Sequence, residues 1–313
     1  MMTAPTRCEV AIVGGGPAGV SCAIWLKQLG FNPILIEKNA TCGGLQLLNA
    51  YTNTWIATSA NAHGKDVAAA LQANIERHEV QTRMSTTAAE ATLNHDGITI
   101  RTDADEVIKA SFLVLAGGVK PKGAGFAARI GLLVGPGPAV ASSDFTGQRV
   151  AILGGGDSAL ENYRFIKNRG ASLVHVYARS IRARAEMLEG ASPDDIHVGS
   201  YTTDADRNLV NGEHYDVVVV LYGYEAHKSA LMGLEPLMRS DGFVFTDQDC
   251  MTSIDRVYAI GEIAQRAHPC CVTSMADGVV AAKAIQRRME ASKASQFLGA
   301  VKRLGRAAAM AAT

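Results

Sequence analysis

The sequence lacks several features that would indicate particular classes of protein. It has six cysteines but no C-x-x-C pair, and no group of Cys and His has zinc-site spacing. Its 30 basic residues balance 30 acidic ones, which leaves no electrostatic footprint for nucleic acid or an anionic membrane. No apolar run approaches the roughly 20 residues of a membrane span. We therefore expect no metal site, no nucleic-acid partner and no membrane partner.

Length and composition set the domain organisation that we expect. A chain of 313 residues exceeds the size at which one core usually stops growing, which favours two domains. Hydrophobic residues make up 48% of the sequence, enough for two buried cores. The first ten residues lack the long apolar segment of a secretory signal. We therefore expect a cytoplasmic protein with reduced cysteines.

A glycine-rich stretch near the start, V-A-I-V-G-G-G-P-A-G at 10–19, carries the first functional signal. In the spacing G-x-G-x-x-G, Gly14 permits a tight turn and Gly16 lets backbone approach a pyrophosphate. Gly19 lets the following helix pack closely on the strand, with its N-terminus toward the phosphates. The next apolar run ends in Glu37, whose carboxylate can accept hydrogen bonds from a ribose. This pattern predicts a dinucleotide site.

A second unit of the same kind begins at the strand Arg149–Leu153, which runs into G-G-G-D-S-A at 154–159. Its next predicted strand, Ser172–Ala178, is followed by Arg179, where the first unit carries Glu37. An arginine at this place suits a 2′-phosphate, whereas an acid suits a free ribose. Arg182 and Arg184 follow, so the charge of this loop favours NADPH over NADH. The alternative is a solvated basic loop without a ligand.

Local patterns predict the remaining elements. Helices are expected at 18–29, 61–79, 160–169 and 275–289, and the tail from Ala291 is either a last helix or a frayed end. Further strands are expected at 9–13, 33–37, 98–102, 106–109, 111–116, 217–221 and 257–260. The chain is expected to enter its second domain close to 118.

The motifs together resemble those of the low-molecular-weight thioredoxin reductase group of flavoproteins. G-G-G-P-A-G at 14–19 is similar to the FAD pyrophosphate motif, C-G-G-L-Q at 42–46 to the loop under the flavin, and G-G-G-D-S-A at 154–159 to the NADPH motif. H-V-Y-A-R-S-I-R-A-R-A-E at 175–186 resembles H-x-x-H-R-R-D-x-x-R-A-E, with Ser180 in place of the second arginine. T-S-I-D-R-V-Y-A-I-G-E at 252–262 and M-A-D-G at 275–278 extend the match over nearly the whole chain.

This resemblance implies an α/β fold with two Rossmann-like, three-layer domains and a homodimer. The FAD domain would comprise 1–117 and 244–313, with the NAD(P)H domain, 118–243, inserted in it. The implied activity is hydride transfer from NADPH to FAD, then electron transfer to an acceptor. FAD is expected at Gly14, Gly15, Gly16, Pro17, Ala18, Gly19, Glu37, Lys38, Gly44, Leu45, Gly261, Glu262 and Thr273. NADPH is expected at Gly154, Gly156, Asp157, Ser158, Ala159, Arg179 and Arg184.

One departure from the family pattern bears on the acceptor. Thioredoxin reductases carry a C-x-x-C shortly before the NADPH motif, and here that place is held by Gly137, Pro138, Ala139 and Val140. A thiol pair is needed there to exchange with a disulfide. The resemblance therefore points to the thioredoxin-reductase-like ferredoxin–NADP reductases, in which flavin passes electrons directly to a partner. The acceptor, a protein or a small molecule, is not identified by the sequence.

Two other functions stay open. The first is a noncanonical thiol oxidoreductase using Cys42, beside the flavin loop, or the pair Cys270-Cys271, before the last helix; packing or cofactor lining is the alternative role of these thiols. The second is a flavin-binding sensor that does not turn over. His268 is a candidate proton relay. Glu262 stands where the family has Asp. Tyr51 and Trp55 are expected to cover the flavin or to pack the dimer, with core packing as the alternative.

Overall fold

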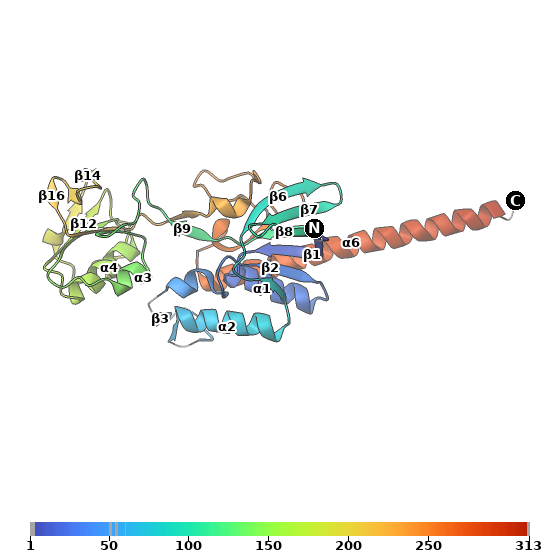
Figure 1. Ribbon diagram of the computed structural model, residues 1–313, viewed down its shortest axis with the longest axis horizontal. Coiled ribbons are helices and arrows are strands. Elements are labelled where there is room, and N and C mark those ends of the chain that lie inside the picture. The colour runs from blue at the N-terminus through green and yellow to red at the C-terminus, as the bar shows by residue number, and fades with distance from the viewer. Residues whose placement is uncertain (1–3, 50–51, 54–55, 60, 312–313) are drawn as a thin grey trace. The chain divides into compact units, whose positions relative to one another are not determined.

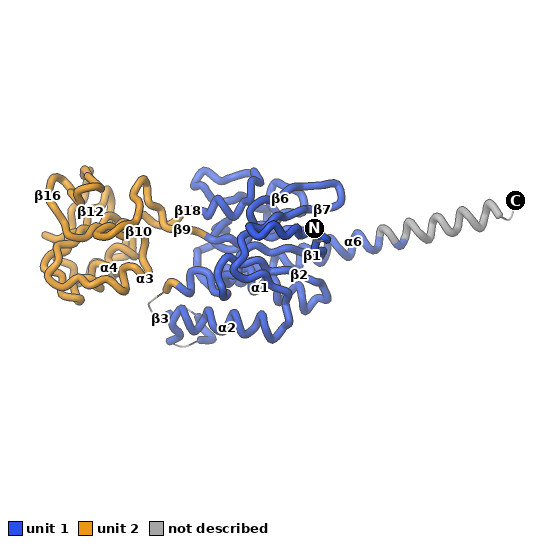
Figure 2. The backbone as a smooth tube through the Cα atoms, in the orientation of Figure 1, with its two compact units in different colours: residues 1–47, 53–118, 226–313 blue, residues 48–52, 119–225 orange. Residues whose placement is uncertain are grey.

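The computed structural model describes residues 4–49, 52–53, 56–59 and 61–311, which leaves Tyr51 and Trp55 outside the described residues. Figure 1 shows the arrangement of helices and strands. Figure 2 shows the two compact units: unit 1 comprises 1–47, 53–118 and 226–313, and unit 2 comprises 48–52 and 119–225. Side chains of residues 295, 296 and 298–311 are not considered.

The chain returns to unit 1 earlier than the expected residue 244. The short helix η3 (Lys228–Leu231) contacts strand β6 (Ala88–Asn94), and the amide of Ala91 donates to the carbonyl of Met232 at 3.0 Å. Gly117 lies so close to this segment that an added Cβ would be 2.1 Å from the Cβ of Ala230. Residues 226–243 therefore belong to unit 1.

Unit 1 is built around a seven-stranded mixed sheet. Strand β1 lies between β2 and β8, parallel to both, and β5 and β19 extend the parallel part of the sheet by pairing with β2 and β8. Strands β6 and β7 form an antiparallel hairpin, and β7 pairs with β8. The bounds are β1 Thr6–Val13, β2 Pro33–Ile36, β5 Gln81–Arg83, β7 Gly97–Thr102, β8 Val107–Leu115 and β19 Val257–Ala259.

One expectation for this sheet was wrong, and two of its strands were missed. The segments 106–109 and 111–116 were predicted as separate strands but form the single strand β8, and β5 and β6 were not predicted. Strand β8 is continuous because different neighbours share one of its edges. Residues 107–110 pair with β7, whereas 113–115 pair with β19. Its neighbour β19 comes from the far end of the sequence, so local patterns could not reveal this pairing.

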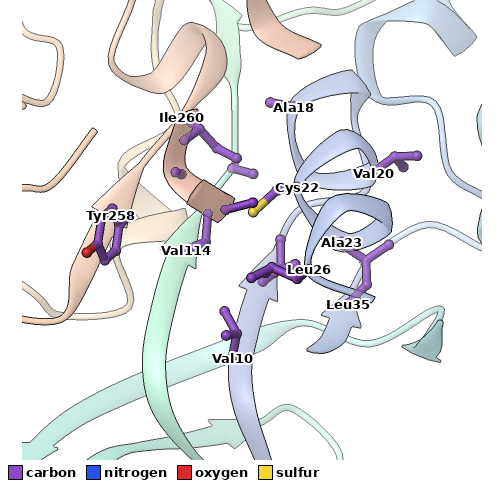
Figure 3. Close-up of a cluster of buried hydrophobic side chains, with 14 of the residues drawn as sticks. Val10, Ala18, Val20, Cys22, Ala23, Leu26, Leu35, Val114, Tyr258 and Ile260 are labelled. Carbon is purple, nitrogen blue, oxygen red and sulfur yellow. The ribbon is translucent and has the colours of Figure 1, made fainter. Parts of the chain in front are cut away.

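The core of unit 1 lies between the sheet and helices α1 (Pro17–Gln28) and α6 (Cys271–Ala311). Figure 3 shows Cys22 and Leu26 of α1 directed toward side chains of β1 and β8, including Val10 and Val114. Helices α1 and α6 pack closely because Gly278 has no side chain: an added Cβ would be 2.5 Å from the carbonyl oxygen of Ala18. Helix α2 (Gly64–Arg77) contacts α1.

Helix α6 is longer than the predicted 275–289, since it continues through the tail to residue 311. Within the described residues, no helix combines the length and the apolar character that crossing a membrane requires.

Unit 2 has a five-stranded parallel sheet in the order β10-β17-β11-β12-β13. Buried apolar residues on both faces of this sheet form two clusters, one of them beneath helix α4 (Asp157–Asn168). The strands are β10 Leu132–Val134, β11 Arg149–Leu153, β12 Leu173–Ala178, β13 Ile196–Val198 and β17 Val217–Val220.

Shorter elements complete the two units. The helices are α3 Pro138–Ser142, α5 Ala185–Leu188, η1 Gly44–Leu48, η2 Pro193–Asp195 and η4 Gly261–Ile263. A three-stranded antiparallel sheet contains β14 Thr203–Asp204, β15 Leu209–Val210 and β16 Glu213–His214. Two-stranded sheets pair β9 Val119–Pro121 with β18 Tyr224–Ala226, and β3 Thr52–Asn53 with β4 Ala62–His63.

Candidate functional site

The first glycine-rich turn connects β1 to α1 in a conformation that requires glycine. Gly14 has φ +114°, and an added Cβ would lie 2.3 Å from the carbonyl oxygen of Ala116. A Cβ at Gly19 would lie 1.9 Å from the carbonyl oxygen of Gly14. Gly16 is the N-cap of α1 and gives it no side-chain hydrogen bond, with Pro17 following in the first turn. The N-terminal amides of α1 thus have no side-chain cap, as a phosphate site requires.

Glu37 lies directly beside this turn. Its carboxylate accepts hydrogen bonds from the amide of Gly15 at 2.6 Å and from the amide of Asn39 at 2.8 Å. The side chain is buried, so the two amides satisfy a charged group that burial would otherwise destabilise. Each carboxylate oxygen has a second lone pair that can accept a ribose hydroxyl. The next residue, Lys38, is exposed, with its Nζ 3.4 Å from Nε2 of His227.

The loop at 42–46 also approaches the glycine-rich turn through backbone. The amide of Gly43 donates to the carbonyl of Gly15 at 2.8 Å, and a Cβ at Gly44 would lie 3.0 Å from the Cα of Gly16. Leu45 follows in η1 and is half-buried. Two glycine backbones therefore face each other beside an uncapped helix N-terminus. This cradle, which side chains at either glycine would fill, fits a dinucleotide such as FAD.

A third segment of the FAD motif, Gly261-Glu262, begins the short helix η4. The amide of Gly261 donates to Asp277 Oδ2 at 3.1 Å, and a Cβ at Gly261 would lie 2.9 Å from the Cβ of Ala18. Glu262 makes no hydrogen bond or ion pair with any described residue, and burial raises the pKa of its carboxyl. A partly buried carboxylate without a partner fits the acidic place in the family's FAD motif.

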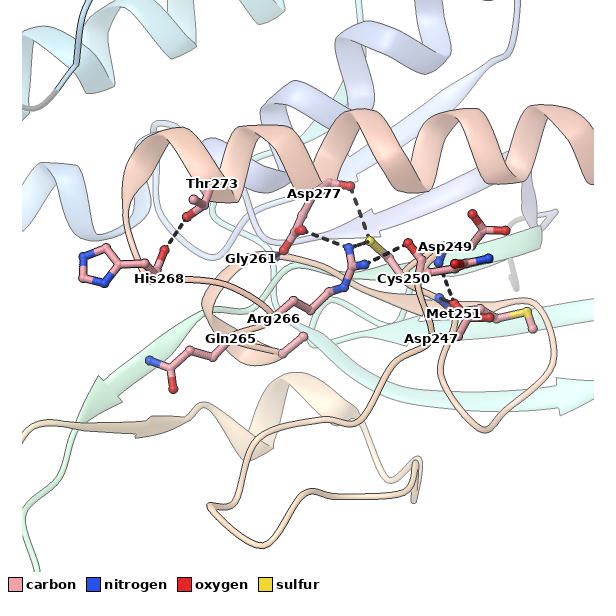
Figure 4. A network of polar contacts seen from close by, with 12 residues as sticks. Asp247, Asp249, Cys250, Met251, Gly261, Gln265, Arg266, His268, Thr273 and Asp277 are labelled. Atoms are coloured by element: carbon pink, nitrogen blue, oxygen red, sulfur yellow. Dashed lines mark hydrogen bonds and ion pairs between the residues drawn. The ribbon is translucent and has the colours of Figure 1, made fainter.

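Asp277 belongs to a polar network that the sequence analysis missed. Figure 4 shows Arg266 donating to Asp277 Oδ1 at 3.1 Å and to the sulfur of Cys250 at 2.6 Å. Arg266 also donates to the carbonyl of Gln248 at 2.8 Å. The network ties α6 to the segment carrying Gly261. The signal for this network in the sequence was the motif M-A-D-G at 275–278, to which the sequence analysis assigned no role for Asp277.

The N-terminus of α6 directs its first amides at a cysteine. The sulfur of Cys270 accepts a hydrogen bond from the Thr273 amide at 3.4 Å and lies 3.4 Å from the Thr273 hydroxyl, which donates to the carbonyl of His268 at 2.7 Å. Burial raises the pKa of the Cys270 thiol, but hydrogen bonds from Thr273 and from the Val272 amide outweigh it and hold that pKa below its usual value. Cys271 is buried, and burial raises its pKa to about 11.

The other candidate side chains differ from Cys270. Cys42 is fully buried, and burial, reinforced by the charge of Glu37, raises its pKa to about 12. This thiol is protonated at neutral pH, which argues against a redox role. His268 is exposed, and its backbone carbonyl accepts the hydrogen bond from Thr273; its imidazole has no hydrogen-bond partner for a proton relay among the described residues.

The second glycine-rich turn, in unit 2, repeats the geometry of the first. Gly154 has φ +154°, and an added Cβ would lie 2.3 Å from the carbonyl oxygen of Leu221. Gly156 is the N-cap of α4, again without a side-chain cap, and a Cβ there would meet nothing within 4 Å. Ser158 is half-buried in the first turn of α4, and Ala159 is buried beneath it. The turn therefore leaves open space at a helix N-terminus, where a pyrophosphate fits.

The arginines of the following loop differ in their partners. Arg179 is exposed, and its side chain makes no hydrogen bond or ion pair with the described residues. Its guanidinium is therefore available to bind an anion. Arg184 instead pairs with Asp157: its amide donates to Oδ1 at 2.8 Å and its Nε to Oδ2 at 2.6 Å. Two residues expected to bind NADPH independently are therefore bound to each other.

The structure brings the predicted site residues together in two sets, one in each unit. In unit 1, the turn at 14–19, Glu37 and the loop at 42–46 are in direct contact, and Gly261 reaches the same helix through Ala18. In unit 2, the turn at 154–159 contacts the loop at 179–184. Nowhere in the described part of the chain do three or more His, Cys, Asp or Glu side chains form a group that could hold a metal ion.

Comparisons with known families agree with this geometry. The family described as pyridine nucleotide-disulphide oxidoreductase matches residues 136–295. The family described as FAD dependent oxidoreductase matches residues 9–118. The two matched regions contain the NADPH-type and FAD-type glycine motifs, respectively.

Individual relatives are similar over most of the chain. A ferredoxin–NADP reductase of Limosilactobacillus fermentum is 28% identical over 82% of this chain and 86% of its own length. A bifunctional thioredoxin reductase/thioredoxin of Mycobacterium leprae is 25% identical over 88% of this chain, but the match spans only 64% of that longer protein. The solved thioredoxin reductase of Lactococcus lactis has a TM-score of 0.75 at 19% identity, over 90% of this chain and 98% of its own.

These matches confirm the predicted α/β fold of two dinucleotide-binding domains. They also confirm the predicted use of FAD and a pyridine nucleotide. The chain belongs to the pyridine nucleotide-disulphide oxidoreductase family and is an FAD-dependent enzyme of the thioredoxin reductase and ferredoxin–NADP reductase type.

Proposed function

We propose that this enzyme passes electrons from NADPH through FAD to an acceptor without a C-x-x-C disulfide, and that the acceptor is a ferredoxin, a flavodoxin or a similar one-electron partner. The observation that carries this proposal is the position of the cysteines. All six lie in the sequence of unit 1, and unit 2 contains none. At the expected C-x-x-C place, Gly137 is the N-cap of α3 and the next three residues begin that helix, with Val140 buried in the apolar core.

Each unit has its own role in the proposal. Unit 1 holds FAD through the turn at 14–19, Glu37, Gly44 and Gly261-Glu262, and unit 2 holds NADPH through the turn at 154–158 and the loop from Arg179. The flavin, when bound, supplies the conversion of two-electron to one-electron transfer. The chain's own groups bind and orient it: amides at the N-termini of α1 and α4 receive phosphates, and the Glu37 carboxylate receives a ribose.

A similarity in sequence supports the choice of acceptor. The relative from Limosilactobacillus fermentum is named a ferredoxin–NADP reductase, and its match extends over most of both chains. The homodimer implied by the resemblance and the cytoplasmic location expected from the sequence stay predictions. Sedimentation of the purified holoenzyme and fractionation of cells would test them.

An anaerobic titration tests the proposal directly. The purified holoenzyme is titrated with NADPH and, separately, with NADH while the flavin absorbance is followed. We expect NADPH to bleach the flavin band stoichiometrically, and reduced enzyme then to reduce ferredoxin or flavodoxin but not oxidised thioredoxin. If neither nucleotide bleaches the flavin, the enzyme proposal is wrong and the sensor alternative gains support.

A thiol oxidoreductase is the second candidate, and Cys270 favours it. Its sulfur accepts hydrogen bonds at the N-terminus of α6, and its pKa is held below the usual value, unlike that of Cys271 or Cys42. The triple variant C42S/C270S/C271S separates the two functions. Unchanged turnover with one-electron acceptors supports the main proposal, whereas loss of a disulfide reductase activity present in the parent supports the thiol route.

A further inference from the structure

The loop between η4 and α6 connects two segments that we expect to contact FAD. Gly261 and Glu262 begin η4, and Thr273 lies in the first turn of α6. Arg266, from the loop between them, pairs with Asp277, which lies one turn after Thr273 on α6; the Nη1 of the arginine is 3.1 Å from Oδ1 of the acid. This ion pair therefore closes the stretch 261–277, which carries both segments.

Asp277 uses its second oxygen for the start of η4. Oδ2 accepts a hydrogen bond from the amide of Gly261 at 3.1 Å. Gly261 is buried and has φ +70°, and its amide lies in the first turn of η4, where no carbonyl of that helix can accept it. The acceptor comes from α6 instead. A single carboxylate thus fixes the backbone at the start of η4 relative to α6.

Arg266 is itself held in place by a third segment of the chain. Its guanidinium also donates to the sulfur of Cys250 at 2.6 Å and to the carbonyl of Gln248 at 2.8 Å, as Figure 4 shows for the sulfur contact. The carbonyl of Cys250 accepts the amide of Ala259, the last residue of β19. The arginine is thereby tied to the strand that leads into η4, so both ends of its contact with Asp277 are fixed.

The surroundings of the pair make its charge important. The side chains of Arg266 and Asp277 are only 23% and 15% exposed, so water screens their attraction less than at an open surface. Burial raises the pKa of the Asp277 carboxyl, and the amide of Gly261 and the charge of Arg266 oppose this shift. Arg266 therefore favours the ionised carboxylate, which is the stronger acceptor for the amide of Gly261.

We propose that Asp277 is a positioning residue of the FAD site and that Arg266 acts through it. Together they hold Gly261-Glu262 and the first turns of α6 in the arrangement that binds FAD. This inference rests on the proposed function, in which Gly261-Glu262 holds FAD. Neither Asp277 nor Arg266 needs to touch the cofactor, because the hydrogen bond to the Gly261 amide carries the effect.

Release of FAD from the holoenzyme tests this role without any turnover. The full-length, FAD-loaded protein is diluted, and the FAD that passes a filter in timed ultrafiltration is measured by its fluorescence. We expect D277N and R266M each to raise the release rate about tenfold to hundredfold, typical of one lost charged hydrogen bond, and to change the visible circular dichroism of the bound flavin. D255N breaks another ion pair of α6, between Asp255 and Arg288 at 2.7 Å, and as the matched control should leave both readouts unchanged.

Two comparisons separate positioning from a general loss of stability. R266K keeps a positive charge for Asp277 on a side chain of similar length, so it should restore most of the slow release that R266M loses. If Arg266 acts through Asp277, R266M should add little to the effect of D277N in the double variant. Fully additive effects, or parental release from R266M, would overturn the inference.

The variant E262A distinguishes failure of this inference from failure of the proposed site. Unchanged release from E262A would show that this segment does not hold FAD, and both assignments would then be wrong. Faster release from E262A, together with parental release from D277N and R266M, would leave the site in place and refute only the positioning role. If D277N is purified without flavin, the comparison of R266M with R266K decides the question.

Discussion

The carboxylate of Glu37 accepts a hydrogen bond from the amide of Gly15 at 2.6 Å, although the two residues are 22 positions apart. This contact joins the end of β2 to the turn between β1 and α1. It places a buried carboxylate at the ribose corner of the proposed FAD site. The same carboxylate is therefore both a part of the protein's structure and a candidate ligand group.

Replacing Glu37 should affect stability and FAD content together. Glu37→Ala leaves the amides of Gly15 and Asn39 without their acceptor, at a cost of about 1–3 kcal/mol for each that stays buried. We expect a lower unfolding midpoint and a lower ratio of flavin to protein absorbance after purification. Glu9→Ala is the matched control, because Glu9 accepts the amide of Asn32 at 2.9 Å in an exposed contact. Full flavin content in Glu37→Ala would contradict the assigned role.

A single methyl group at Gly278 should separate α1 from α6. An added Cβ would be 2.5 Å from the carbonyl oxygen of Ala18 and 2.7 Å from the amide of Cys22, both backbone atoms of α1. Gly278→Ala should therefore destabilise unit 1 by about 2 kcal/mol, the cost of overpacking a core, despite the better helix propensity of alanine. Urea unfolding measures this change. Ala276→Ser, an added atom at an exposed position of the same helix, should have little effect.

Cys270 should be the first of the six cysteines to react with an alkylating reagent. Its pKa is below the usual value, so the reactive thiolate is present at lower pH than for an ordinary cysteine. Burial raises the pKa of Cys42 and Cys250 to about 12 and prevents the reagent from reaching either thiol. Mass spectrometry after brief treatment with iodoacetamide at several pH values would rank them. Thr273→Val, which removes the hydroxyl that lies 3.4 Å from the sulfur, should move the Cys270 rate profile to higher pH. A faster reaction at Cys271 would contradict this ranking.

The parts of the site that depend on short sequence separations were predictable. The glycine spacing at 14–19 and at 154–159 reflects local requirements: a positive φ at Gly14 and Gly154, and backbone contacts that exclude a Cβ. Such requirements permit one residue type, so they are visible in the sequence. The strand β11 was likewise predicted with its observed bounds, because an apolar run ending in glycines has few alternatives.

Contacts between distant segments were not predictable in the same way. The hydroxyl of Ser21 donates to the carbonyl of Met275, which lies 254 residues later in the sequence. No local pattern indicates that α1 and α6 pack there. The pairing of Arg184 with Asp157 also escaped prediction. Both residues matched family motifs singly, and only the fold shows that each is the partner of the other. The return of the chain to unit 1 at residue 226 was also missed, because only the contact between η3 and β6 shows that this segment belongs to unit 1.

A partly buried histidine in unit 2, His175, makes that unit's stability dependent on pH. His175 Nδ1 lies 2.7 Å from the hydroxyl of Tyr215, which donates to Glu213 at 2.9 Å. Burial lowers the pKa of His175 from its ordinary 6.5, and the neighbouring His197 lowers it further. The remaining charged or titratable groups around it are Tyr177, Arg149 and two acids that oppose the shift, Glu213 and Asp195.

The folded protein thus favours the neutral imidazole of His175. As the pH falls below 6.5, the unfolded chain takes up a proton that the folded chain refuses, so stability is lost until the folded pKa is passed. One proton limits the slope to about 1.4 kcal/mol per pH unit. Hydrogen exchange of the β12 amides between pH 7.5 and 5, corrected for intrinsic rates, measures this loss. His175→Gln should flatten the profile, whereas His214→Gln, at an exposed histidine of β16, should not; equal slopes in both variants would show that another group titrates.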